Sequence, residues 1–247
     1  MAVVTGANTG IGRAVARRLA ELGMAVYLGA RNEERGKTAE SELRAPGLDV
    51  RFVRLDVTGE ETVGLAAKRI EEECGRLDVL VNNAGVSTSW KAPSQTTADE
   101  MRSVFDANVF GVATVTNELL PLLRGSNAGR IVNISSTFGS FGAAAEKRDP
   151  AGHMPPGEFP VILDYGTSNT ALNFMTLMYA HELRDAGVLV NAVCPGYVAT
   201  DRNNGQGALT PEQAALVPVR LATLPDDGPT GTFTGSDGTS EGLPMPW

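Results

Sequence analysis

Short apolar segments alternate with longer segments of helical hydrophobic spacing along most of the chain. The apolar segments contain few polar residues, which is typical of strands that helices cover on both faces. They predict strands over residues 2–4, 25–29, 50–55, 79–81, 130–134 and 188–193. The segments between them predict helices over residues 12–22, 33–44, 62–74, 99–123 and 168–186. This alternation indicates an α/β fold, a Rossmann-type doubly wound parallel sheet flanked by helices.

Two stretches interrupt the alternation. Residues 142–160 carry several prolines and charges, so we expect a surface insertion before the next helix. Residues 226–247 are rich in glycine and proline around a short β-like segment at 232–235, which predicts a strand at the sheet edge followed by an irregular tail. Because no linker or long repeat occurs, residues 1–247 are expected to form a single domain.

Composition and charge exclude several classes of protein. The chain has 247 residues, with 21 Lys and Arg against 29 Asp and Glu, and a net charge of −8. Without clustered basic residues we expect no nucleic-acid partner. No apolar run approaches the roughly 20 residues of a membrane span, and the first residues show no signal peptide, so we expect no membrane partner. Cys74 and Cys194 form no disulfide framework or metal-binding pattern, which favours a cytoplasmic protein without a metal site.

A glycine-rich loop follows the first predicted strand and opens the first helix. Its glycines permit a tight turn, close approach of the backbone to a pyrophosphate, and close contact between helix and strand. The start of the helix offers free N–H groups and a positive dipole end to an anion. The loop therefore predicts a dinucleotide site formed by Gly6, Asn8, Thr9, Gly10, Ile11 and Gly12.

The end of the second predicted strand indicates which dinucleotide binds. An acidic residue there would hold the ribose hydroxyls of NAD, whereas a basic residue accepts a 2′-phosphate. Arg31 stands at this point, and Arg35 follows one helical turn later. Both could grip a phosphate, and Arg31 could also lie over the adenine face. We therefore predict NADP(H) rather than NAD(H) as the cofactor.

The motifs between residues 3 and 200 resemble the short-chain dehydrogenase/reductase family. The resemblance is carried, in this order, by the glycine loop, Asp56-Val57, Asn82-Asn83-Ala84-Gly85, Asn108, Ser135-Ser136, Tyr165 and Pro195-Gly196. It implies that Asp56 contacts the adenine, with Val57 beside it. It also implies that the turn including Asn82, Ala84 and Gly85 supports the cofactor. The residues implied to border the nicotinamide are Pro195, Gly196, Val198 and Thr200.

The resemblance also implies three catalytic residues. Tyr165 would donate a proton to the substrate, Ser136 would hold the substrate oxygen, and Asn108 would order a water relay. Reduction by hydride develops negative charge on a carbonyl oxygen, and a phenol can supply the compensating proton. We choose Ser136 over Ser135 because the segment from Ser136 to Gly139 fits the family's spacing better.

The family's fourth catalytic residue is a lysine one helical turn after the tyrosine, and here that position is Asn169. An amide can hydrogen-bond a ribose hydroxyl or a water, but it carries no positive charge to ease proton loss from Tyr165. We therefore expect cofactor binding to survive and reductase activity to be weakened. All lysines of the chain precede this helix: Lys37, Lys68, Lys91 and Lys147.

Three explanations of Asn169 stay open. It is an engineered substitution that traps a complex, or a natural variant whose charge comes from elsewhere, or the sign of non-redox chemistry such as dehydration, isomerisation or cyclisation. A non-catalytic NADP-binding protein is a further alternative. Retention of Tyr165, Ser136 and Asn108 argues against that alternative, since a pure sensor does not need them.

Within the family, the chain looks like the NADPH-dependent carbonyl reductase branch. Tyr165 follows Ser136 by 29 positions because the insertion lies between them. In that branch the insertion obstructs helix packing between subunits, so we expect a monomer. We expect residues 86–90, 138–141 and 197–208 to wall the substrate site. Their aromatic residues favour a small apolar or aromatic carbonyl substrate, whereas His153 and His181 are too isolated to predict as ligands or bases. The aromatic residues are Trp90, Phe138, Phe141 and Tyr197.

Overall fold

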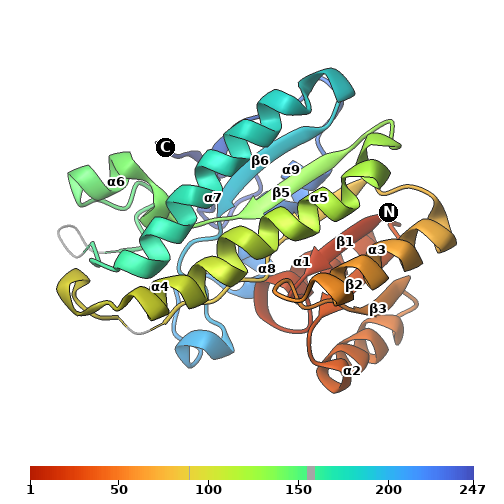
Figure 1. The fold of residues 1–247 in the computed structure, drawn as a ribbon, viewed down its shortest axis with the longest axis horizontal. Helices are drawn as coiled ribbons and strands as arrows, with labels where there is room; N and C mark the ends of the chain where they lie inside the picture. The colour runs from red at the N-terminus through yellow and green to blue at the C-terminus, as the bar shows by residue number, and fades with distance from the viewer. Residues whose placement is uncertain (89, 155–158) are drawn as a thin grey trace.

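One sheet of eight strands runs through the computed structural model, which describes residues 1–88, 90–154 and 159–247 (Figure 1). The strand order is β3-β2-β1-β4-β5-β6-β7-β8, parallel up to β7, with β8 antiparallel to β7. This arrangement confirms the doubly wound α/β fold. The strands are β1 Ala2–Thr5, β2 Val26–Ala30, β3 Val50–Arg54, β4 Val79–Asn82, β5 Arg130–Ile134, β6 Leu189–Cys194, β7 Phe233–Gly235 and β8 Leu243–Pro244.

Helices cover both faces of the sheet, and successive strand residues point to opposite faces. Val4 packs in one core with helices α1, α2 and α9, whereas its neighbour Val3 packs in a second core with α3, α5 and α7. In Figure 1 the second group of helices lies in front of the sheet. The helices are α1 Gly10–Glu21, α2 Glu33–Arg44, α3 Glu60–Cys74, α4 Ala98–Phe105, α5 Gly111–Arg124, α6 Phe141–Glu146, α7 Leu163–Glu182, α8 Pro211–Ala214 and α9 Leu216–Ala222.

The strand order reverses between β1 and β4, and this position determines where a ligand fits. The chain leaves β1 toward β2 and β3 on one side, and returns to β4 on the other. The loops after these two strands therefore separate at the carboxyl edge of the sheet and leave a crevice between them. The glycine loop follows β1, so it lies at one wall of that crevice.

Two helix predictions were wrong in ways that matter for the site. The helix predicted at 168–186 begins at Leu163, so Tyr165 lies inside its first turn rather than before it. Gly166 and the polar residues after it resemble a turn in sequence, but the Asp164 side chain accepts a hydrogen bond from the Tyr165 N–H at 2.8 Å and supports the helix start. The helix predicted at 99–123 is interrupted by a π-helical segment over Asp106–Phe110.

The two irregular stretches contain more structure than predicted. Part of the insertion predicted at 142–160 belongs to α6, while residues 155–158 of it lie outside the described residues. The strand predicted at 232–235 is present as β7, and the tail adds β8, whose Leu243 pairs with Gly235. Helices α8 and α9 were not predicted. Within the described parts of the chain, no helix combines the length and the apolar character needed to cross a bilayer.

Candidate functional site

A single cleft of about 1100 Å³ at the carboxyl ends of the strands brings the predicted site residues together. Loops after β1 to β6 and the first turns of α7 contribute to its walls. Every residue predicted for cofactor binding or catalysis lines it, although those predictions came from segments spread over almost two hundred positions. The cleft has two ends: the cofactor end, formed by the glycine loop and the residues after β2, and the catalytic end, formed around Tyr165.

The glycine loop is shaped by contacts that leave no room for side chains. Gly6 and Gly10 have φ angles of 61° and 55°, which L side chains rarely adopt. A Cβ on Gly12 would lie 2.4 Å from Asn83 Nδ2 and 2.7 Å from the Gly6 carbonyl oxygen. The residues that lead into α1, from Asn8 to Gly12, line the cleft. This shape fits the pyrophosphate of a dinucleotide.

Asn83 fixes the loop, a specific role that the sequence did not reveal. Its side-chain amide donates hydrogen bonds to the carbonyl oxygens of Thr5 at 2.9 Å and Gly6 at 3.1 Å. In return, the Thr5 hydroxyl accepts from the N–H groups of Asn83 and Ala84 at 2.9 and 3.0 Å. These bonds join the ends of β1 and β4, so they hold both walls of the crevice at a fixed separation.

Two arginines mark the cofactor end. Arg31 and Arg35 are exposed, line the cleft, and form no ion pair within the part of the chain that the structure describes. The Asn32 side chain between them accepts a hydrogen bond from the Arg35 N–H and caps α2. Both guanidinium groups are thus available to a phosphate.

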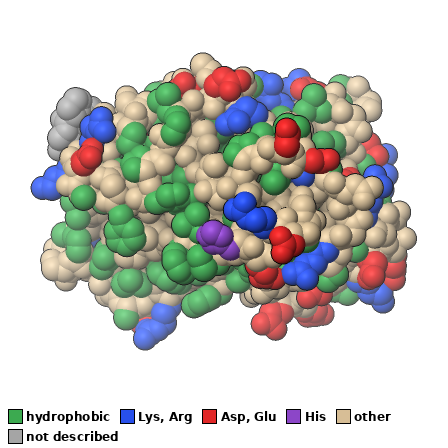
Figure 2. Space-filling model, turned by 90° about the horizontal axis from the view of Figure 1, so that it is seen from above, with side chains coloured by type: hydrophobic (Ala, Val, Ile, Leu, Met, Phe, Trp, Pro, Cys, Tyr) green, Lys and Arg blue, Asp and Glu red, His purple; other side chains and the backbone are tan. Residues whose placement is uncertain are grey.

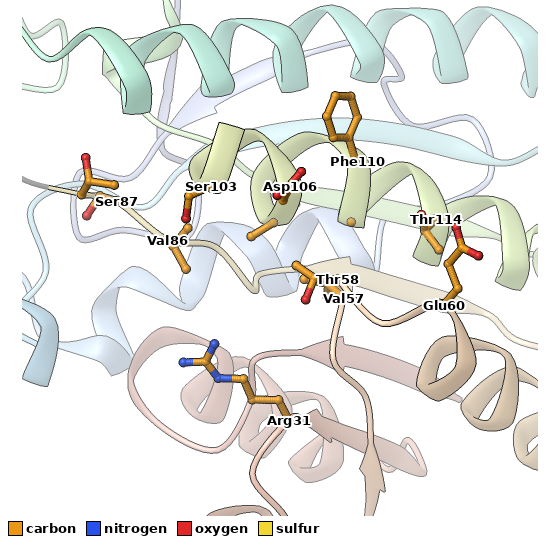
Figure 3. A pocket seen from close by; sticks show the side chains of 13 residues that line it. Arg31, Val57, Thr58, Glu60, Val86, Ser87, Ser103, Asp106, Phe110 and Thr114 are labelled. Carbon is orange, nitrogen blue, oxygen red and sulfur yellow. The ribbon is translucent and has the colours of Figure 1, made fainter. Parts of the chain in front are cut away.

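A second hollow of about 640 Å³ adjoins the cleft at Arg31. Figure 3 shows Arg31 reaching toward it from the end of β2, with Ser103 on α4 and Asp106 and Phe110 on the π-helical segment across from it; the ring of Phe110 points away from Arg31. Val57 after β3 lies between them. The hollow gives the cofactor end polar, open space beside its arginines.

Polar side chains at the catalytic end are joined to one another. Asn108 lies in the π-helical segment, and its amide donates to the Val86 carbonyl oxygen at 2.8 Å and to the Ser168 hydroxyl at 3.1 Å. Its carbonyl oxygen accepts from the Val86 N–H at 2.8 Å. Ser168 and Asn169 both donate to the Tyr165 carbonyl oxygen, at 2.9 Å each. A π-helical turn at such a place is common at functional sites because it redirects side chains.

The structure distinguishes the two candidate serines. The Ser135 hydroxyl donates to Asn173 Oδ1 at 2.6 Å and is committed to α7. The Ser136 hydroxyl accepts only a long bond, 3.3 Å, from the Phe138 N–H, so its own proton is free to be donated within the described surroundings. This geometry agrees with the choice of Ser136.

The environment of the Tyr165 hydroxyl raises its pKa above the ordinary value. Removal from water is the largest cause, because it penalises the charged phenolate. The positive charge of Arg202 and the polar side chains of Ser136 and Asn169 act in the opposite direction, and the nearby Cys194 adds to the rise. The Tyr165 hydroxyl therefore keeps its proton at neutral pH.

Aromatic rings wall the substrate side of the catalytic end. The Phe138 ring meets Trp90, Phe159 and Tyr165 edge to face, with centroids 6.2, 5.4 and 6.2 Å apart. Trp90, Phe138 and Tyr197 line the cleft as predicted. Phe141 does not: it is 74% exposed at the start of α6, so its prediction was wrong. Ser89, in the predicted wall at 86–90, lies outside the described residues.

Two further side chains, those of Asp149 and His153, line the cleft without having been predicted as site residues. Asp149 is nearly buried and accepts hydrogen bonds from the N–H groups of Ala151 and His153. His153 in turn lies 2.5 Å from the Ser236 carbonyl oxygen through Nε2. The insertion before α7 is thereby attached to the residues that follow β7, and His153, dismissed as isolated, lines the cleft. His181 is exposed on α7, away from the residues that line the cleft.

Comparison with known proteins places this geometry in a family. The chain matches the short chain dehydrogenase family over residues 1–147 and 150–208. It is 35% identical to the short-chain dehydrogenase anuI of Penicillium roqueforti (strain FM164), covering 90% of this chain and 88% of that one. It is 34% identical to carbonyl reductase [NADPH] 1 of Mus musculus, covering 94% and 95%. Among solved structures, salutaridine reductase from Papaver somniferum superposes with a TM-score of 0.78 at 31% identity, covering 94% and 98%.

Proposed function

The chain belongs to the short chain dehydrogenase family, and from that premise we propose that it reduces the carbonyl group of a small apolar or aromatic ketone or aldehyde. It is an oxidoreductase of the carbonyl reductase type, and its cofactor is NADP(H). One observation carries the proposal. Tyr165, Ser136 and Asn108 lie at one end of the same cleft whose other end holds a glycine loop and two arginines.

The cofactor end fits NADP(H) residue by residue. The glycine loop has no room for side chains, so its backbone can approach the pyrophosphate at the start of α1. Arg31 and Arg35 would hold the 2′-phosphate, with Arg31 over the adenine and Asp56 and Val57 at its edge. Pro195, Gly196, Val198 and Thr200 line the opposite wall, where the nicotinamide would lie. When bound, NADPH supplies the hydride.

The catalytic end supplies the proton and holds the substrate. Ser136 would donate a hydrogen bond to the substrate oxygen and orient the carbonyl. Tyr165 would donate its hydroxyl proton to that oxygen as negative charge develops there. Asn108 holds the segment after β4 through Val86 and contacts Ser168, so in this chain it positions α7 against that segment.

Asn169 makes the proton transfer harder. Its amide donates to the Tyr165 carbonyl oxygen and it is buried, so it stabilises the helix turn that carries Tyr165 but provides no charge. Loss of an acid–base partner typically costs roughly 10²–10⁴ in rate. We therefore propose a reductase of reduced efficiency. Non-redox chemistry on the same fold is the second candidate, and the missing lysine is the observation that favours it.

The substrate class follows from the wall of the cleft. Phe138 and its ring contacts with Trp90 and Phe159 present apolar edges beside Tyr165. An aromatic or aliphatic carbonyl compound would bury apolar surface there, at about 25 cal/mol per Å². A highly charged sugar would not.

The association state and the location of the protein are parts of the proposal. We propose a monomer in the cytoplasm, supported by the insertion before α7 and by the two unpaired cysteines. Phe174 and Met178, exposed on α7, are the residues that an oligomer would cover. Figure 2 shows one face on which hydrophobic side chains gather over one half, with more of the charged ones over the other. Light scattering that gives a dimer or tetramer mass would overturn the monomer.

The test compares the unsubstituted chain with Asn169→Lys, and with Asn169→Met as an uncharged control of similar reach. NADPH absorbance is followed with a panel of aromatic and aliphatic ketones, and NADPH binding is measured by fluorescence. We expect all three to bind NADPH, and the lysine variant to turn over roughly 10²-fold faster. Equal turnover would mean that the site moves the proton without lysine. Binding without NADPH oxidation in any variant would overturn the reductase and favour non-redox chemistry.

A further inference from the structure

Positive charge is scarce in the cleft. Among the described residues that line it, the only Lys or Arg side chains are those of Arg31, Arg35 and Arg202. Arg31 and Arg35 stand after β2 and in α2, at the cofactor end. Arg202 stands on the loop after β6, beyond the residues that face the nicotinamide position. Of the three, it is the one that reaches Gly85, in the segment after β4 that packs on Asn108.

The loop that carries Arg202 is held in a defined shape. Thr200 and Asn203 cap a short 3₁₀ turn over Asp201–Asn203, with the Thr200 N–H donating to Asn203 Oδ1 at 3.0 Å. The Asn203 amide donates to the Val198 carbonyl oxygen at 2.9 Å. The backbone at Arg202 is therefore fixed relative to the end of β6.

The guanidinium of Arg202 crosses to the opposite wall. It donates a hydrogen bond to the carbonyl oxygen of Gly85, in the segment after β4. Gly85 packs on the catalytic end, since a Cβ at that position would lie 3.1 Å from Asn108 Oδ1. Arg202 forms no ion pair with any residue that the structure describes, so no carboxylate neutralises its charge there.

We propose that Arg202 supplies the positive charge that stabilises the oxygen of Tyr165 after it gives up its proton, in place of the lysine that position 169 lacks. This inference rests on the proposed reductase function. Arg202 acts through Tyr165 and is an electrostatic partner of the proton donor.

The electrostatics of Tyr165 support this assignment. Of the charges around Tyr165, that of Arg202 lowers the pKa of its hydroxyl, against removal from water and the Cys194 thiol, which raise it. The nearby carboxylates are engaged elsewhere: Asp164 with Thr88 and the Tyr165 N–H, and Asp149 with the insertion backbone. The remaining titratable side chains that line this end are His153, Tyr197 and Asp201.

An arginine changes how the proton is replaced. The O–H bond of Tyr165 breaks as the O–H bond of the product alcohol forms, while the hydride goes from NADPH to the carbonyl carbon, and a phenolate remains. A lysine can both stabilise the phenolate and pass on a proton, whereas a guanidinium keeps its protons in proteins. The phenolate must then recover its proton from water. Arg202 therefore contributes charge alone, and its effect should appear in the pH dependence of turnover.

The experiment replaces Arg202 by Leu and by Lys, in the unsubstituted chain and in the Asn169→Lys background. Arg184→Leu, at an exposed turn after α7, is the matched control. Oxidation of an alcohol by NADP requires the phenolate, so its rate rises with pH through the pKa of Tyr165. Loss of Arg202 raises that pKa and shifts the rising part of the pH–rate curve to higher pH. We expect Arg202→Leu to lower the rate at neutral pH roughly tenfold.

The lower rate of Arg202→Leu should result from the missing positive charge rather than from the changed shape of the side chain. Arg202→Lys should restore most of the rate, and the same Leu change should cost less in the Asn169→Lys background, where a second cation is present. The Kd of Arg202→Leu for NADPH should change by less than about twofold. A tenfold change would correspond to about 1.4 kcal/mol of binding free energy. Ultraviolet titration of the phenolate, taken as the difference from Tyr165→Phe, should show the same shift without any turnover.

Three results would overturn the inference. If Arg202→Leu binds NADPH more weakly but its pH–rate curve is unchanged, Arg202 anchors the cofactor. A higher KM confined to ketones that carry a carboxylate would show that it holds an anionic substrate. An unmoved phenolate titration would show that its charge does not reach Tyr165. If no variant oxidises NADPH yet the titration shifts, the reductase proposal fails while the electrostatic link between Arg202 and Tyr165 stands.

Discussion

The two ends of the cleft are built by different means, although both lie at the carboxyl ends of the same parallel strands. At the cofactor end, the shape of the loop requires glycine at two positions: Gly6 has a positive φ, and Gly12 has no space for a Cβ. At the catalytic end, the shape comes from side chains that hold one another, with Asn108 joined to Val86 and Ser168. The shape of the cofactor end thus depends on one loop, and the shape of the catalytic end depends on side chains from several elements.

Because the two ends are built differently, substitutions in them should affect different properties of the protein. A substitution in the glycine loop fills space and should act on cofactor affinity, because backbone N–H groups are then kept from the pyrophosphate. A substitution at Tyr165 or Asn169 leaves that space unchanged and should act on turnover. If the two ends are independent, cofactor binding and turnover should respond separately to substitutions.

The largest effect is expected from Tyr165→Phe. Removal of the hydroxyl takes away the proton donor and should lower turnover of ketones by roughly 10²–10⁴. NADPH affinity should remain within about twofold, far below tenfold, because the ring and the helix turn are retained. Tyr179→Phe, whose hydroxyl bonds Asn117 away from the cleft, is the matched control. Turnover that survives in Tyr165→Phe would remove Tyr165 from the mechanism.

Gly12→Ala should show the opposite behaviour. The added Cβ must displace Asn83 Nδ2 and the Gly6 carbonyl oxygen, at a cost of about 1–3 kcal/mol. We expect NADPH affinity to fall roughly tenfold or more, with turnover at saturating NADPH less affected. Gly64→Ala is the control, since that helical glycine has only the Glu118 carboxylate within 4 Å. Equal effects of the two substitutions on binding would contradict a specific role of the glycine loop.

The glycine loop could be recognised from the sequence because its information is local. Eight consecutive residues with three glycines, placed between a strand and a helix, already define the loop. Arg202 could not be found in this way: it reaches Gly85 across the cleft only because β4 and β6 end at the same edge of the sheet. Phe141 was misplaced because Ser140 caps α6 and directs the chain outward. The early start of α7 was missed because Gly166 looks like a turn residue.

The smallest effect concerns the choice between NADPH and NADH. Arg31→Ser should weaken NADPH binding by about 1–2 kcal/mol, roughly tenfold, by removing a charge-assisted contact with the 2′-phosphate. NADH affinity should fall by much less, because NADH lacks that phosphate and loses only the contact of Arg31 with the adenine. Arg44→Ser, at the far end of α2 and paired with Glu40, is the control. The two affinities are measured by fluorescence titration at one ionic strength, since salt screens exposed charges. Equal losses for NADPH and NADH would mean that Arg31 holds the adenine face instead, and phosphate recognition would then fall to Arg35, which lines the same end of the cleft.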